Sequence, residues 1–132
     1  MAVEFRSGLL RLVTLGYALG ILVLGVIPMG PLPLPTTFVP QDKLMHAAVF
    51  SGFTVLVFWA TPRRLRRAIG AAVIATAFGG LLELLQALVP YRSADWFDLL
   101  ADAVGAAIAA LLLGLVGRLR NRASDPRSPV DR

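Results

Sequence analysis

The sequence predicts an all-α integral membrane protein, a four-helix bundle with both termini in the cytoplasm (N-in/C-in). Of its 132 residues, 57% are hydrophobic, and the mean hydropathy is +0.73, far above a soluble globular domain. The apolar residues gather in long runs without the period of two that marks barrel strands. Backbone groups in lipid must be hydrogen-bonded within the chain, so these runs are expected to be helices.

Four runs approach the roughly 20 apolar residues that a spanning helix needs: residues 9–27, 44–60, 68–89 and 99–117. The first is long for a signal-peptide core and lacks a small-residue cleavage site, so we expect it to remain as a helix. Small residues four apart, Gly16 with Gly20 and Gly105 with Ala101 and Ala109, are expected to let helices pack closely.

Arginines flank the apolar runs and predict the orientation. The connection between the second and third runs reads TPRRLRR, and further arginines precede the first run and follow the last. Basic loops stay in the cytoplasm, which places the proline-rich segment before residue 44 and the loop near residues 90–98 outside. We expect a membrane domain of residues 1–117 and a basic, disordered cytoplasmic tail of residues 118–132.

Composition also bounds the function. The net charge is +5 and the chain has no cysteine. Because the positive charges lie at the ends of apolar runs, they indicate topology and not nucleic-acid binding. The absence of cysteine excludes thiolate chemistry. We predict no cofactor and no metal site, and membrane lipids as the nearest partners.

The remaining polar residues fall near the outer ends of the predicted helices. Glu83 is the deepest, about 9 Å below residue 89 at 1.5 Å per residue. A charge facing lipid there would approach a cost of roughly 2.5 to 3.5 kcal/mol, so Glu83 must face inward. His46 and Glu83 are the candidate catalytic residues. The predicted binding site comprises Asp42, Lys43, His46, Glu83, Gln86, Arg92, Asp98 and Asp102.

Helical spacing groups these residues on shared faces. Asp42 and His46 are four apart, so we expect Asp42 to orient the imidazole. Lys43 and Arg92 are the bases expected to hold an anionic headgroup. The alternative for Asp42, Asp95 and Asp98 is that they only cap helix N-termini, where acids are favourable.

Three stretches in order, DKLMHAAVF, ELLQ and RSADWFDLLADAVG, resemble the VanZ-like family, known for a member associated with teicoplanin resistance. The resemblance implies a multi-pass protein of the bacterial plasma membrane. This chain departs from the family pattern at Asp102, where many members have Asn, and at Ala109, where Gly is common. The resemblance marks as family residues Asp42, Lys43, His46, Phe50, Glu83, Gln86, Arg92, Asp98 and Gly105.

Three functions follow from this pattern. The first, which we favour, is an extracytoplasmic pocket that binds a lipid-linked cell-wall precursor or another envelope component and influences glycopeptide susceptibility. The second is a membrane enzyme acting on a lipid-linked or phosphorylated substrate, with His46 or Glu83 as general base and carboxylates as metal ligands. The third is a structural bundle whose polar residues lock the helices together. The sequence sets neither the ligand nor the oligomeric state.

Overall fold

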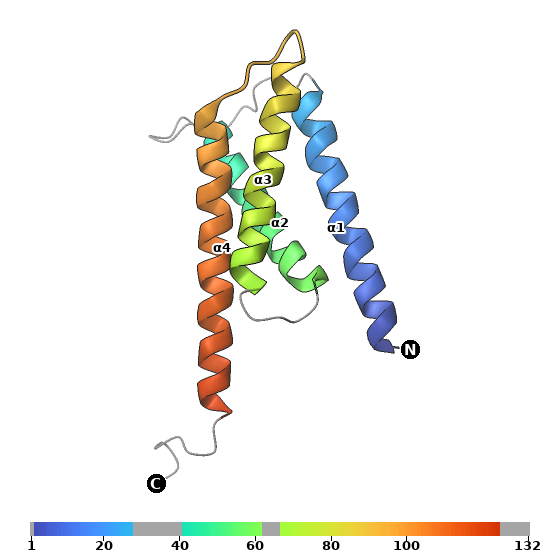
Figure 1. Cartoon of the computed structure of the whole chain (residues 1–132), viewed down its shortest axis with the longest axis vertical. Coiled ribbons are helices and arrows are strands. Elements are labelled where there is room, and N and C mark those ends of the chain that lie inside the picture. Colours follow the sequence, from blue (N-terminus) through green and yellow to red (C-terminus); the bar gives the residue numbers. More distant parts are fainter. Residues whose placement is uncertain (1, 28–40, 62–66, 125–132) are drawn as a thin grey trace.

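Four helices form an up-and-down bundle in this computed structural model, which describes residues 2–27, 41–61 and 67–124 (Figure 1). They are α1 (Ala2–Val26), α2 (Gln41–Ala60), α3 (Arg67–Ala87) and α4 (Trp96–Ala123). No strand occurs in the described residues, and each helix is long and apolar enough to cross a membrane. The predicted all-α membrane fold is therefore confirmed.

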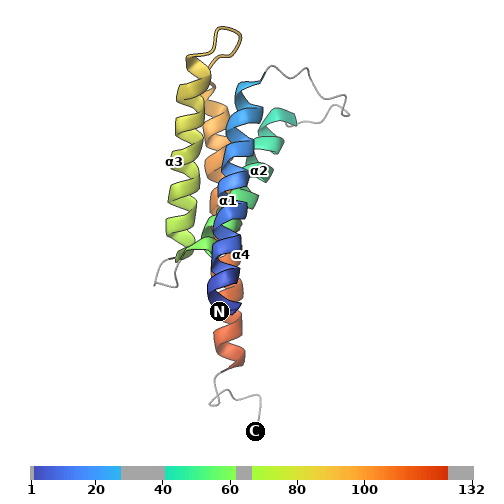
Figure 2. The ribbon, with the colours of Figure 1, turned by 90° about the vertical axis from the view of Figure 1, so that its right-hand side faces the viewer.

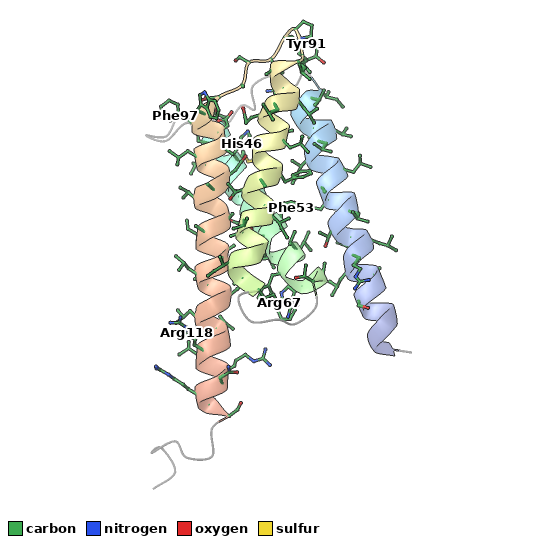
Figure 3. The ribbon with its side chains drawn as sticks, viewed as in Figure 1. His46, Phe53, Arg67, Tyr91, Phe97 and Arg118 are labelled. Atoms are coloured by element: carbon green, nitrogen blue, oxygen red, sulfur yellow. The ribbon has the colours of Figure 1, made fainter. Side chains whose placement is uncertain are left out.

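Helix α1 begins and α4 ends at the same end of the bundle, as both views show (Figures 1 and 2). We call this the basic end, because Arg67 and Arg118 lie there (Figure 3). The opposite end, where α1 and α3 finish and α2 and α4 begin, is the polar end. An even number of crossings agrees with the N-in/C-in prediction, while the side of the membrane that each end faces stays a prediction.

Helix α2 is central and packs most closely against α4. Aromatic rings fill its inner face: Phe53 lies 5.0 Å from Phe78 of α3 between ring centroids, and Phe50 is 1% exposed. Helix α1 packs on α2 and α3, and its Tyr17 hydroxyl donates to the Val49 carbonyl at 3.0 Å. Large apolar side chains cover the outside of the bundle, as expected of a surface that faces lipid.

The small residues predicted to mediate packing divide into two groups. Gly105 of α4 touches α2 so closely that an added Cβ would overlap the Ala47 carbonyl. Ala109, one turn further along α4, is also buried. By contrast, nothing lies within 4 Å of a Cβ built on Gly16 or Gly20. The spacing on α4 therefore marks a real contact, and the spacing on α1 faces away from the rest of the described chain.

The helices extend beyond the apolar runs at several ends. Helix α2 starts at Gln41 and α4 at Trp96, three residues before the predicted starts in both cases. The added residues of α2 are polar, whereas α4 begins with two aromatic residues and Asp98 directly after its N-cap, Asp95. Helix α4 also continues to Ala123, so the first residues of the predicted disordered tail are helical. Leucine and arginine are good helix formers, and basic side chains favour a helix C-terminus. The last turn carries Arg120 and Arg122.

Candidate functional site

Lys43, in the first turn of α2, joins α2 to the start of α4. Its Nζ atom lies 2.7 Å from Oδ2 of Asp95 and 2.5 Å from Oδ1 of Asp98. A third carboxylate, that of Asp42, lies 3.3 Å away. The ammonium group is thus surrounded by carboxylates of this chain, which leaves it poorly placed to receive an anionic ligand.

Asp95 is the N-cap of α4, which confirms the capping interpretation for this residue. Its backbone is extended, with φ −120° and ψ 112°, and its side chain accepts a hydrogen bond from the Phe97 amide at 2.8 Å. The hydrogen bond from Lys43 and the bond from Phe97 hold the pKa of the Asp95 carboxyl below its usual value. Asp95 therefore stabilises both the helix start and the contact between α2 and α4.

His46 lies one turn deeper along α2 and is paired with Asp102 of α4. The two atoms Nδ1 of His46 and Oδ1 of Asp102 are 2.8 Å apart, and Nε2 lies 3.7 Å from Oδ2 of Asp98. The Asp102 side chain is 0% exposed. It fits because α3 has Gly79 at this point: a Cβ there would lie 2.5 Å from Oδ2 of Asp102.

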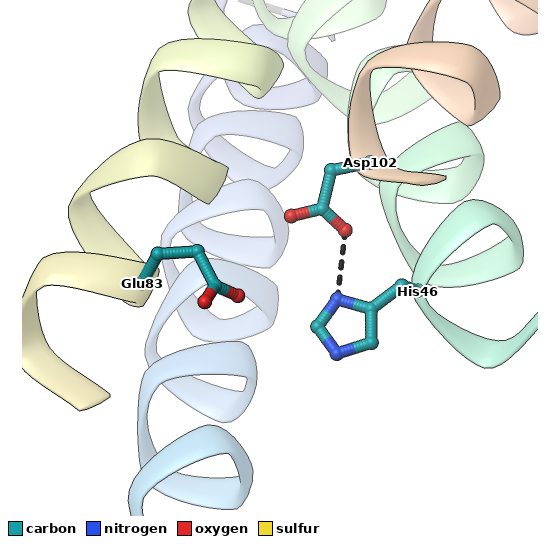
Figure 4. Close-up of side chains that lie close together, drawn as sticks. All are labelled: His46, Glu83 and Asp102. Atoms are coloured by element: carbon teal, nitrogen blue, oxygen red, sulfur yellow. Dashed lines mark hydrogen bonds and ion pairs between the residues drawn. The ribbon is translucent and has the colours of Figure 1, made fainter. Parts of the chain in front are cut away.

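Glu83 reaches the same place from α3 (Figure 4). One carboxylate oxygen, Oε2, accepts a hydrogen bond from the Asp95 amide at 2.7 Å, so Glu83 anchors the start of α4. The other oxygen, Oε1, is buried and has no hydrogen-bond partner within the described part of the chain, and the same holds for Oδ2 of Asp102. Glu83 faces inward, as its depth predicted.

Together His46, Glu83 and Asp102 form a cluster, here named the acidic triad. Each offers one nitrogen or oxygen atom, and these three atoms lie within 4.8 Å of one another. Glu83 is 5% and Asp102 0% exposed. At 1.5 Å per residue the three lie about 6 to 9 Å from the ends of their helices at the polar end.

Gln86 and Arg92 are predicted site residues that the structure places beside α1. The Gln86 amide donates to the Gly25 carbonyl at 2.9 Å, and the Arg92 guanidinium donates to the Ile27 carbonyl at 3.3 Å. The last carbonyls of a helix lack partners within the helix, which explains why these donors gather there. Their contacts support the end of α1, and a role in binding stays a prediction.

Asp42 does not hold His46. Its side chain is 59% exposed and contacts Lys43, and the structure gives no hydrogen bond or ion pair between Asp42 and His46. The imidazole turns toward α4, where a buried carboxylate is available. The residue that orients His46 is Asp102, so the interpretation built on the four-residue spacing was wrong about the partner.

Two glycines position the site; close packing was expected of Gly105 from sequence, and no role was expected of Gly79. Gly79 makes room for the Asp102 carboxylate, and Gly105 lets α4 approach α2 so closely that Ser51 donates to the Gly105 carbonyl at 2.8 Å. The resemblance marks Gly105, but its neighbour is visible only in three dimensions. For Gly79 the only sequence signal is the pair of glycines at 79 and 80 in the middle of an apolar run.

The electrostatic balance of the polar end is negative. Five carboxyl groups face Lys43 and His46, while Arg92 points to α1. Such a site favours a cation or a hydrogen-bond donor over a bare anion. Its buried imidazole–carboxylate pair is also an arrangement that can orient a ring for proton transfer.

Comparisons with known proteins place this chain in a family. The family model of VanZ/LLP1 matches residues 26–117, which include α2, α3 and most of α4. The chain is similar to an uncharacterized protein of the fission yeast Schizosaccharomyces pombe, 34% identical over 91 residues, or 67% of this chain and 52% of that protein. The chain thus spans about half the length of this relative. No solved structure matches it. The chain belongs to the VanZ/LLP1 family.

Proposed function

We propose that the polar end binds the polar headgroup of a membrane lipid or of a lipid-linked envelope component. The observation that carries this proposal is the pair of buried carboxylate oxygens beside His46, Oε1 of Glu83 and Oδ2 of Asp102, that have no hydrogen-bond partner among the residues the structure describes. A buried polar atom without a hydrogen bond costs about 1 to 3 kcal/mol. Such atoms are rare in native proteins and call for an explanation.

A purely structural bundle accounts for part of the site. Lys43 ties α2 to α4, and Glu83 anchors the Asp95 amide. These contacts need neither the second oxygen of Glu83 nor a carboxylate at Asp102, and an apolar interior of similar volume is often more stable than a buried ionic group. The unpaired oxygens therefore favour a site that binds a ligand over a site that only holds the helices together.

A lipid is the ligand class that suits the surroundings. An apolar groove of about 660 Å³ runs between α3 and α4, lined by small residues that include Ala72, Ala77, Ala103 and Ala107. It lies in the middle of the bundle, toward the basic end from the acidic triad, with Ala103 directly after Asp102 in α4. A lipid whose headgroup lies at the polar end has room for an acyl chain in this groove.

The charge of the site decides which part of a headgroup it accepts. Lys43 and Arg92, the bases expected from sequence to hold an anionic headgroup, are already engaged by carboxylates and by the end of α1. The geometry instead favours hydrogen-bond donors and positive groups of the headgroup at the carboxylates. A phosphate would need a positive charge beyond Lys43 and Arg92, the described basic side chains at this end.

Native mass spectrometry of the protein in mild detergent tests this proposal. We expect the wild-type chain to retain a defined lipid, and His46→Ala to lose most of it because the triad is broken. Thr61→Ala, at the basic end, removes a local hydrogen bond to the Val57 carbonyl and serves as the matched control. The same lipid retained equally by all three proteins would contradict the proposal.

A second candidate is an enzyme that modifies such a headgroup. The observation favouring it is the His46–Asp102 pair, because a buried carboxylate that fixes an imidazole is a common device in acid–base catalysis. Incubation of reconstituted protein with a membrane lipid extract should then release headgroup with time in the wild type but not in His46→Ala. A lipid that is retained but not chemically altered would contradict the enzyme and support binding alone.

An influence on teicoplanin-type glycopeptides is the narrowest form of the proposal and rests on the family alone. It follows only where the bound component is a lipid-linked wall precursor. The similarity to a fungal protein favours a general membrane lipid. Comparing glycopeptide susceptibility of a bacterial host expressing the wild type or His46→Ala tests this form, and equal susceptibility would count against it.

A further inference from the structure

We infer that His46, Glu83 and Asp102 bind a divalent metal ion at the polar end, with Zn²⁺ or Mn²⁺ as the best matches. The three residues come from α2, α3 and α4 and point toward one another (Figure 4). Their donor atoms lie within 4.8 Å of one another. From sequence, carboxylates were expected as metal ligands only in the enzyme alternative. His46, Glu83 and Asp102 are 37 and 19 positions apart along the chain, and the fold brings them together.

The burial of unpaired carboxylate oxygens is an independent observation that points to a ligand. Glu83 and Asp102 are 5% and 0% exposed, and each has one oxygen without a hydrogen-bond partner in the described residues. Two carboxylates this close repel each other when both are ionised. A divalent cation between them satisfies both orphaned oxygens and removes the repulsion.

The donor set selects the class of metal. Carboxylate oxygens suit Mg²⁺, Ca²⁺ and Mn²⁺, whereas an imidazole nitrogen favours transition metals. One imidazole with two carboxylates is therefore a mixed set that matches Zn²⁺ or Mn²⁺. Ligand atoms about 2.1 Å from a tetrahedral metal are about 3.4 Å apart, so donor atoms that are up to 4.8 Å apart in the structure must close by about 1.4 Å.

Neighbouring groups hold two of the ligands in place. The Asp95 amide fixes one oxygen of Glu83 and leaves the other free. Gly79 and the packed interface of α3 and α4 hold the Asp102 carboxylate toward the cluster. Such outer contacts commonly orient metal ligands. With three protein ligands, a four-coordinate Zn²⁺ keeps one position open to water or to a ligand oxygen.

This inference deepens the proposed function and rests on it for one point, the role of the metal toward a headgroup. The polar end has an excess of carboxylates, and Lys43 is enclosed by three of them. A divalent ion at the triad supplies the positive charge that a phosphate-bearing headgroup requires. Metal binding itself depends only on the three side chains.

The chain has one histidine, which makes its imidazole nitrogens a unique reporter. The protein is prepared with a tag that contains no histidine, labelled with ¹⁵N-histidine, stripped with chelator and titrated with Zn²⁺ in micelles. We expect a saturable shift of one imidazole nitrogen resonance at one Zn²⁺ per chain. His46 resonances that neither shift with excess Zn²⁺ nor broaden with Mn²⁺ would overturn the inference.

Variants then identify the other ligands by metal content after dialysis and by Zn²⁺ titration. Glu83→Gln and Asp102→Asn keep shape and should weaken Zn²⁺ binding about tenfold or more. Asp42→Asn is the matched control: it removes one negative charge at the same end from a side chain that is 59% exposed and contacts Lys43, and it should bind Zn²⁺ nearly as the wild type does. Equal weakening in all three would assign the effect to general charge and contradict the site.

Circular dichroism checks that each variant is folded. Where a variant is not folded, the wild-type titration alone tests whether the metal site exists. Lipid retention measured on the same samples separates the two proposals. Zinc bound without any retained lipid keeps the metal site and removes the proposed function. If the lipid is retained but the His46 signal neither shifts with Zn²⁺ nor broadens with Mn²⁺, the proposed function stands and the metal site is contradicted.

Discussion

Asp102 holds His46 across the interface of α2 and α4, with Nδ1 and Oδ1 separated by 2.8 Å. The carboxylate is fully buried, and the imidazole is 20% exposed. This pair links the most buried charged side chain of the described residues to an imidazole ring that is still accessible from the polar end. It is therefore both a packing element and the centre of the candidate site.

Replacing Asp102 should separate these two roles. Asp102→Asn keeps the volume and a hydrogen bond to His46, so the protein should unfold at nearly the wild-type temperature in detergent. Asp102→Ala leaves the imidazole without its partner and opens a cavity. We expect the free energy of unfolding to fall by about 1 to 3 kcal/mol. Equal unfolding of the alanine variant and the wild type would show that the pair adds nothing to stability.

Gly105 should tolerate no side chain. A Cβ at this position would overlap the Ala47 carbonyl, so Gly105→Ala must push α4 away from α2, at a cost of about 1 to 3 kcal/mol. Gly114→Ala is the control, because nothing lies within 4 Å of its Cβ and alanine is the better helix former. Thermal unfolding of both variants in detergent tests this, and similar midpoints would contradict the close approach.

Acid should weaken the contact of Asp95 with Lys43. The pKa of Asp95 lies below its usual 3.8 in the folded protein, so the carboxylate contributes stability above that pH and loses it as pH falls through the lowered pKa. The difference in unfolding midpoint between wild type and Asp95→Asn should be present at pH 6 and shrink near pH 3. A difference that stays constant with pH would assign it to something other than this ion pair.

Orientation is tested by single cysteines, since the chain has none of its own. Ala94 lies before α4 at the polar end, and Ala123 closes α4 at the basic end. With N-in/C-in topology, an impermeant thiol reagent on intact cells should label Ala94→Cys and spare Ala123→Cys until the membrane is opened. Cysteines at Thr37 and Leu65 extend the test to connections outside the described residues. The reverse labelling pattern would invert the topology.

Periodicity and hydropathy were sufficient for the four helices because lipid leaves a spanning segment few alternatives. Helix ends were less predictable. Helix α2 begins with three polar residues, and α4 begins with Trp96 and Phe97 directly after the N-cap Asp95; the apolar runs mark neither start. The inward position of Glu83 followed from the cost of exposing a charge to lipid.

Partners of side chains across helices were the part that sequence could not supply. Spacing within α2 suggested Asp42 for His46, but the nearest carboxylate comes from α4, and its position depends on Gly79 of α3 and Gly105 of α4. Arg92 was placed with the acids by loop assignment, yet the free carbonyls at the end of α1 attract it. Rotation of each helix about its axis decides such contacts, and periodicity alone does not fix it.

The central claim, that the polar end binds the polar headgroup of a membrane lipid beside His46, is tested most directly by the imidazole resonances of ¹⁵N-histidine-labelled protein in micelles. The protein is titrated with a membrane lipid extract, and separately with the same extract after phospholipase C has removed the phosphate headgroups. We predict a saturable shift of the His46 signals with the intact lipids and none with the treated ones. Identical responses to the two extracts, or no response to either, would contradict the account.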